Sequence, residues 1–75
     1  MSTKLLPISR RELIKRLGSF GFTGPYPGMK HFHMVRDDVF VMIPNPHHVE
    51  KISVKPQLII LKEAGISRDE WLSAT

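Results

Sequence analysis

The sequence predicts an α+β fold of the order α-β-β-β-α, in which a three-stranded antiparallel sheet packs on two helices and a short helical tail follows. Apolar residues recur at helical spacing towards both ends of the 75-residue chain, whereas the middle alternates or forms short β-prone runs. Most glycines and prolines lie between these segments, where turns are expected. Length and the absence of repeats favour a single domain over residues 1–75.

The first helix is predicted to begin at Ser9. The run Ser9–Glu12 has the capping-box pattern, in which the serine and glutamate side chains each satisfy a backbone donor at a helix start. Gly21 is a natural left-handed end for this helix. The apolar residues between them follow helical spacing, and they are Leu13, Ile14, Leu17 and Phe20.

Three strands are expected in the middle of the chain. The glycine- and proline-rich stretch 23–28 is interpreted as a short edge strand or loop. Residues 31–36 alternate as a half-buried strand, with His31, His33 and Val35 on one face. Asp37-Asp38 suits a tight turn into the β-prone run 39–43, so the two strands are predicted to form a hairpin.

A second helix is predicted after Ser53, which is a plausible N-cap. Pro56 is tolerated in a first turn, and Gly65 again fits a left-handed end. The run Leu58–Leu61 belongs mainly to the core, but four consecutive apolar residues cannot all face one way on a helix. We therefore expect Ile59 to remain exposed for a partner.

A helical tail is predicted where Ser67–Glu70 repeats the capping-box pattern. Trp71 and Leu72 follow it, and we expect them to fold back on the core.

Composition narrows the function classes. The formal net charge is +4 and the sequence pI is about 9.9, which favours a polyanionic partner such as nucleic acid or an acidic protein. Cysteine is absent, which excludes disulfide, thiol and cysteine-zinc chemistry. No apolar stretch approaches a membrane span or a signal-peptide core, so we expect no membrane partner and a cytoplasmic location.

Much of the positive charge belongs to the predicted first helix. Arg11 and Lys15 lie one turn apart, opposite the apolar face. Such a face is either a solvated surface or, if it is coplanar with the site described next, a track for RNA phosphates.

The stretch Gly28–Val35 contains the candidate catalytic residues. It places Lys30 and His31 where a glycine-rich turn becomes a strand. Imidazole can accept and return a proton near neutral pH, as acid/base cleavage of RNA requires, and a neighbouring cation can stabilise charge at the phosphate. His33 shares a face with His31, so the two histidines could together bind a metal ion. We predict no metal, because two nitrogen ligands without a cysteine or a nearby carboxylate are weak support for a metal site.

Four segments of the chain together carry a resemblance to a known family. They are residues 8–15 with Leu17 and Gly21-Phe22, the Gly28 to His31 stretch, residues 43–47, and residues 60–67, of which the last segment is the most specific. In these segments the chain resembles the HicA-type toxins, small ribonucleases of bacterial or archaeal toxin–antitoxin pairs.

This resemblance implies a double-stranded-RNA-binding-like fold, cleavage of mRNA without a cofactor, and neutralisation by a HicB-like antitoxin. The family's catalytic histidine falls by position on His31, which follows Lys30. We expect His31 to act as acid and base, and a monomer when no antitoxin is bound. Contacts to RNA are expected from Lys30, Arg11, Lys15, His33 and, in the proline-rich loop, His47.

Two function classes follow from these observations. In one, the protein is a metal-independent endoribonuclease, the toxin of a type II pair. In the other, it is a non-catalytic RNA-binding or antitoxin-docking module on the same fold.

Overall fold

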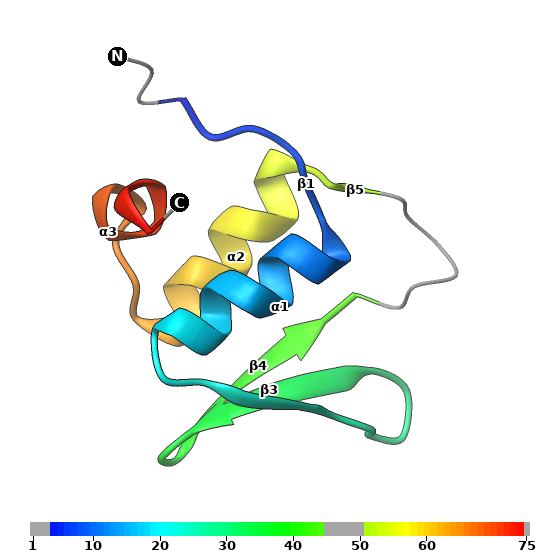
Figure 1. The fold of residues 1–75 in the computed structure, drawn as a ribbon. Helices are drawn as coiled ribbons and strands as arrows, with labels where there is room; N and C mark the ends of the chain where they lie inside the picture. The colour runs from blue at the N-terminus through cyan, green and yellow to red at the C-terminus, as the bar shows by residue number, and fades with distance from the viewer. Residues whose placement is uncertain (1–3, 45–50, 75) are drawn as a thin grey trace.

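The computed structural model describes residues 4–44 and 51–74. It is a small α+β structure in which helices and a three-stranded antiparallel sheet enclose a shared core (Figure 1). The elements follow one another as β1 (Ile8–Ser9), α1 (Arg10–Ser19), β2 (Thr23–Tyr26), β3 (Phe32–Arg36), β4 (Val39–Ile43), β5 (Lys51–Ile52), α2 (Val54–Ala64) and α3 (Arg68–Ser73).

The main sheet has the order β2-β3-β4, and both pairings are antiparallel. The predicted hairpin is confirmed, with Phe32 opposite Ile43 and Arg36 opposite Val39. Its turn holds Asp37 at a positive φ of 56°, which aspartate tolerates better than most residues. The stretch interpreted as an edge strand or loop forms the edge strand β2.

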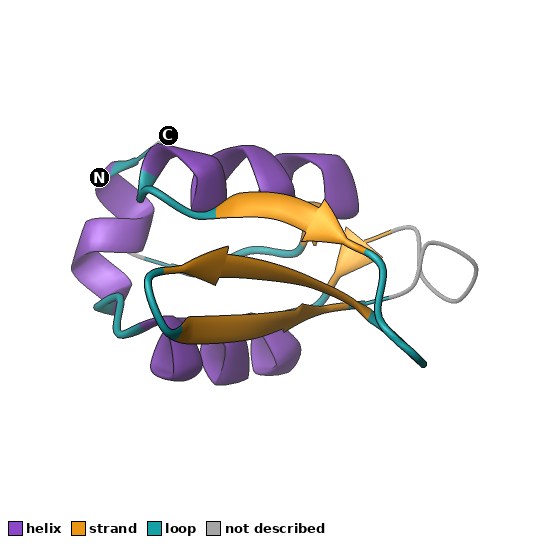
Figure 2. Cartoon of the chain, turned by 90° about the horizontal axis from the view of Figure 1, so that it is seen from below, coloured by secondary structure: helices purple, strands orange, loops and turns teal. Residues whose placement is uncertain are grey.

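Alternation along the strands decides which face of this sheet is covered. Met34 on β3 and Val41 and Ile43 on β4 point into the core. Helix α1 contacts β2, and α2 contacts β4, so both helices lie on the same side of the sheet, and the view from below has the strands in front (Figure 2). In the described part of the chain, no helix covers the opposite face.

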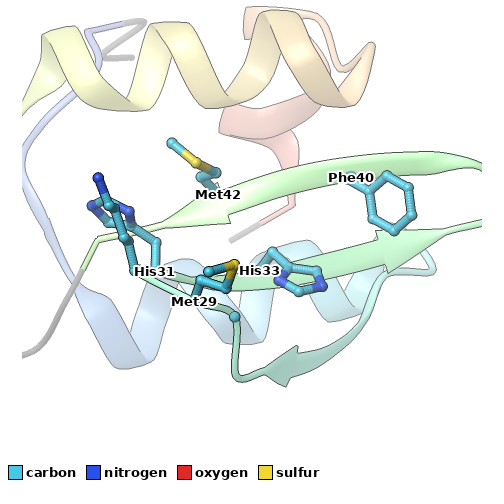
Figure 3. Close-up of a pocket in the computed structure, with 7 residues that line it drawn as sticks. Met29, His31, His33, Phe40 and Met42 are labelled. Carbon is cyan, nitrogen blue, oxygen red and sulfur yellow. The ribbon is translucent and has the colours of Figure 1, made fainter.

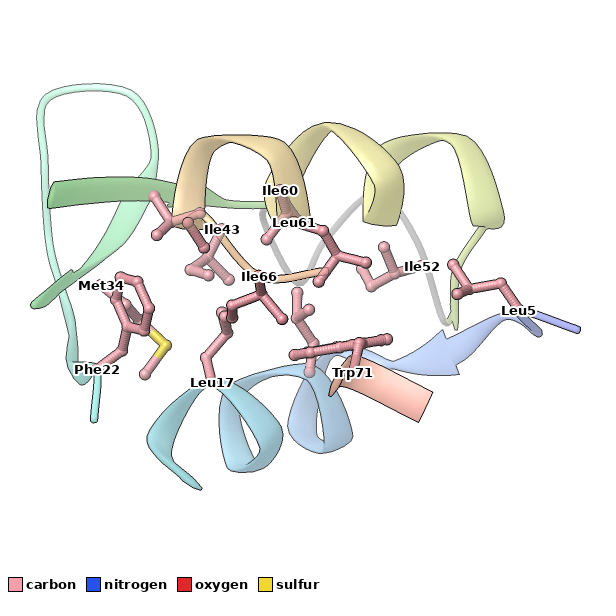
Figure 4. Packing of buried hydrophobic residues seen from close by; sticks show 13 residues of the cluster. Leu5, Leu17, Phe22, Met34, Ile43, Ile52, Ile60, Leu61, Ile66 and Trp71 are labelled. Carbon is pink, nitrogen blue, oxygen red and sulfur yellow. The ribbon is translucent and has the colours of Figure 1, made fainter. Parts of the chain in front are cut away.

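The core lies between the inner face of the sheet and the helices (Figure 4). The predicted tail completes it. Trp71 is fully buried, and its ring stacks on Phe20 with 6.0 Å between centroids. Among the apolar run of α2, Ile60 and Leu61 are buried and Leu58 and Ile59 exposed, which confirms that the run is divided.

Most predicted helix ends are confirmed. Gly21 follows α1 with φ of 92°, and Gly65 ends α2 in the left-handed region with φ of 72°. The capping box before α3 is complete, since the Ser67 and Glu70 side chains each accept a hydrogen bond from the other residue's backbone N–H.

Ser53 is confirmed as the N-cap of α2, although its side chain makes no capping hydrogen bond. Two local predictions need correction. Ser9 caps α1 by accepting from the Glu12 N–H, but the Glu12 carboxylate accepts from Arg16 instead of completing the box. The strand expected from His31 begins at Phe32.

The short strands β1 and β5 were not predicted. They pair Ile8 with Ile52 and Ser9 with Lys51. Two residues are too few to show a period, so the pairing leaves no signal in the sequence.

Candidate functional site

His31 is exposed and directly precedes β3. The loop before it is tight, because Gly28 lies against the backbone of His31. A Cβ at Gly28 would come within 2.5 Å of the His31 carbonyl oxygen and 3.3 Å of His33 Nδ1. The glycine therefore allows the close approach that sets where His31 leaves the loop.

The imidazole of His31 lies where two hollows meet. The outer hollow, about 670 Å³ and broad, covers the helix-free face of the sheet near β3 and β4 (Figure 3). Its lining residues are Gly28, Met29, Lys30, His31, His33, Phe40 and Met42. The helix-side hollow, about 260 Å³, lies between β4 and α2 and is lined by His31, Met42, Ile43, Pro44, Pro56, Ile59, Ile60 and Glu63.

The structure brings three of the predicted site residues together. Lys30, His31 and His33 all line the outer hollow. His33 is half-buried and lies in register with Met42 of β4 and Tyr26 of β2. Its ring is 6.4 Å from that of Tyr26 and 5.8 Å from that of Phe40, centroid to centroid.

Arg11 and Lys15 are exposed on α1 and line neither hollow. Their helix packs on the inner side of the sheet, whereas the outer hollow opens on the other side. RNA bound at His31 would reach them only by extending past the sheet. His47 lies outside the described residues.

Arg10, the first residue of α1, is a further candidate for the site that was not predicted from the sequence. Its Nε donates a 2.9 Å hydrogen bond to the Pro44 carbonyl, and its guanidinium lies 5.1 Å from the centre of the Phe32 ring. Pro44 lines the helix-side hollow with His31, so this guanidinium is anchored at the end of the sheet where His31 lies. The position of Arg10, directly after the N-cap Ser9, does not predict its hydrogen bond to Pro44.

The aromatic surface beside His31 was also missed. Residues 39–43 are all apolar, so the sequence alternation that would separate Phe40 and Met42 from their buried neighbours is hidden. The structure leaves Phe40 64% and Met42 57% exposed.

Residues 4–44 and 51–74 contain no group of three or more histidine, cysteine or acidic residues able to hold a metal ion. In the same ranges no helix has both the length and the apolar character that crossing a bilayer requires.

Comparisons of the chain with protein-family models, curated proteins and solved structures found no match.

Proposed function

We propose that this protein is a metal-independent endoribonuclease that cuts mRNA, with His31 as the acid/base group. The observation that carries the proposal is the position of His31, an exposed imidazole between two hollows at the end of the sheet. Lys30 lines the outer hollow beside it. An RNA strand needs such an accessible site, since phosphate and ribose must both reach the catalytic group.

In this mechanism His31 takes the proton from a ribose 2′-hydroxyl. The 2′-oxygen attacks the adjacent phosphorus, the bond from phosphorus to the 5′-oxygen breaks, and the protonated His31 gives its proton to the departing 5′-oxygen. The products are a 2′,3′-cyclic phosphate and a 5′-hydroxyl, and no water is consumed. Lys30, and the guanidinium of Arg10 anchored on Pro44, would stabilise the negative charge on the phosphate.

The biological role that fits is that of a HicA-type toxin in a type II toxin–antitoxin pair. The α+β architecture is compatible with the double-stranded-RNA-binding-like fold that this role implies, and the net charge of +4 suits RNA. A HicB-like antitoxin, acidic where it meets this site, would neutralise the toxin in the cytoplasm by covering His31 and Lys30.

The test is the His31→Ala variant. We expect it to lose RNA cleavage, with a fall of about 10²–10⁴-fold or more, and to lose growth arrest on induced expression. His31 is exposed, so circular dichroism and the unfolding midpoint should match those of the parent protein. His33→Ala, which removes the other histidine of the outer hollow, should lose much less activity, because His33 is expected to contact RNA without transferring a proton.

Two outcomes would contradict the proposal. If His31→Ala cut RNA at the parental rate, His31 would not be the acid/base group. If excess chelator stopped cleavage and a divalent ion restored it, metal-assisted hydrolysis would replace the acid/base mechanism. A parent protein that binds RNA without cutting it would favour the non-catalytic module.

A further inference from the structure

The outer face of the sheet carries a row of three rings that catalysis by His31 does not explain, with the half-buried His33 between two exposed rings. Tyr26 of β2, His33 of β3 and Phe40 of β4 lie on three neighbouring strands, with 6.4 Å and 5.8 Å between successive ring centroids and interplanar angles of 51° and 74°. Tyr26 is 46% exposed and Phe40 64% exposed. Large apolar side chains that gather on one uncovered face mark an interaction surface.

The charge and chemistry of this face indicate its occupant. The outer hollow has no acidic residue among its lining residues and includes Lys30, so a polyanion can approach it. Every nucleobase presents a π-face that stacks on an aromatic ring, whatever the sequence. A second copy of this chain would carry the same formal net charge of +4, and repulsion between two like-charged molecules opposes self-association.

We propose that Tyr26, His33 and Phe40 form a stacking platform for the unpaired bases of single-stranded RNA. The proposal rests on the proposed function only in that the platform would deliver the backbone of the bound strand to His31. The geometry supports this because His31 lines the same outer hollow as His33 and Phe40 (Figure 3). Paired bases already stack inside a duplex, so the platform selects unpaired RNA over double-stranded RNA.

The experiment measures binding of an end-labelled single-stranded 2′-O-methyl oligonucleotide by fluorescence anisotropy. The blocked 2′-oxygen prevents cleavage, so binding is measured apart from catalysis. Phe40→Leu keeps an apolar side chain and removes the ring, and we expect about tenfold weaker binding, with a further loss in the Phe40→Leu, Tyr26→Leu double variant. A blunt 2′-O-methyl duplex should bind more weakly and respond little to either variant.

Leu58→Ala is the matched control. Leu58 is an exposed apolar residue of α2 that lines neither hollow, and its loss should leave RNA binding unchanged. Circular dichroism of each variant checks that the fold is retained, as the exposure of Phe40 leads us to expect.

The outcomes separate this inference from the ribonuclease proposal. If Phe40→Leu bound single-stranded RNA as the parent does while His31→Ala still lost cleavage, the platform would be wrong and the ribonuclease would stand. If Phe40→Leu lost binding but His31→Ala cut normally, the platform would stand alone. A parent protein that dimerises in sedimentation experiments, with Phe40→Leu monomeric and unaltered in RNA binding, would make the face a self-association surface and overturn the platform.

Discussion

Gly28 controls the position of His31 through space, because any side chain there meets the backbone that carries the imidazole. A Cβ would lie 2.5 Å from the His31 carbonyl oxygen, closer than real Cβ contacts allow. If His31 is the acid/base group proposed above, Gly28→Ala should displace the loop and lower RNA cleavage at least tenfold, as misplacement of a catalytic group by about 1 Å does. Initial cleavage rates under single-turnover conditions measure this.

Gly18 provides the control within the same chain. An added Cβ at this helical position meets nothing within 4 Å. Gly18→Ala should leave cleavage unchanged and stabilise α1 by about 0.5–1 kcal/mol, since alanine is the better helix former. Equal cleavage by the two alanine variants would show that the close approach at Gly28 does not position His31.

Single residues also show where sequence reasoning stops. His31 was chosen from a local pattern, a histidine that follows a glycine-rich turn at a strand entry, and its catalytic role stays a prediction. In the sequence, nothing distinguishes Arg10 and Arg36 from basic residues that are simply exposed to solvent. In the structure Arg10 donates to the Pro44 carbonyl, and Arg36 donates to the carbonyls of Phe20 and Ala64, at the ends of α1 and α2. These contacts span 16 to 34 residues, and no local pattern encodes them.

Among the elements, α2 is tied to its neighbours by one buried amide. Gln57 Nε2 donates to the carbonyls of Leu6 and Ile52, and its Oε1 accepts from Trp71 Nε1. The side chain thereby joins the N-terminal segment, β5, α2 and α3. A glutamine gives no sign in the sequence that it will be 1% exposed.

Gln57→Leu should lower the free energy of unfolding by about 2–4 kcal/mol, because two carbonyls and an indole N–H lose their partner in the interior. Urea unfolding followed by Trp71 fluorescence measures it. The control is Lys55→Leu, which introduces leucine at an exposed position of the same helix and should change the free energy of unfolding by less than about 0.5 kcal/mol. Parental stability in Gln57→Leu would mean that the three groups find other partners.

The cap of α3 gives a pH-dependent prediction. The Ser67 backbone N–H, then the Ser67 hydroxyl, and more weakly the charge of Arg36 hold the pKa of the Glu70 carboxyl below its ordinary value of 4.5. The unfolded chain therefore takes up this proton more readily than the folded protein. The stabilisation is complete above pH 4.5 and is lost as the pH falls through the lowered pKa.

Glu70→Gln should accordingly be less stable than the parent near pH 7 and equally stable in acid, where the protonated carboxyl resembles an amide. Thermal unfolding midpoints between pH 7 and pH 2 measure the difference. In a Ser67→Ala background, which lacks the serine hydroxyl, the effect of Glu70→Gln should shrink. A difference that stays constant across this pH range would rule out the charged cap as its source.

At the scale of the whole molecule, the α+β class could be predicted because the residues that face the core recur along the sequence at the spacing of a helix or a strand. The sheet buries Met34, Val41 and Ile43, and within residues 4–44 and 51–74 the helices cover only that face. The apolar outer face was not foreseen, because residues 39–43 form an unbroken apolar run in which the sequence does not distinguish Phe40 and Met42 from their buried neighbours. Only the assembled sheet shows which of them the helices leave exposed.

The last prediction concerns the basic face of α1 and asks whether RNA bound at His31 would also extend over Arg11 and Lys15. Arg11 and Lys15 line neither hollow, so under the proposed function they would contact RNA only if the strand continued from His31 over α1. Each phosphate contact releases counterions, and the Arg11→Ala, Lys15→Ala double variant should reduce the slope of log affinity against log salt by ~0.7–0.9 per lost contact. The loss should be similar for all 2′-O-methyl oligonucleotide sequences.

The matched control is Lys55→Ala, Lys62→Ala, which removes two exposed charges from α2 and leaves the same net charge. If RNA follows α1, the α1 double variant changes the slope and the α2 double variant does not, since a phosphate contact is local and bulk charge is screened over about 10 Å. Equal slopes in both variants and the parent would confine bound RNA to the hollows around His31 and make the basic face of α1 a solvated surface.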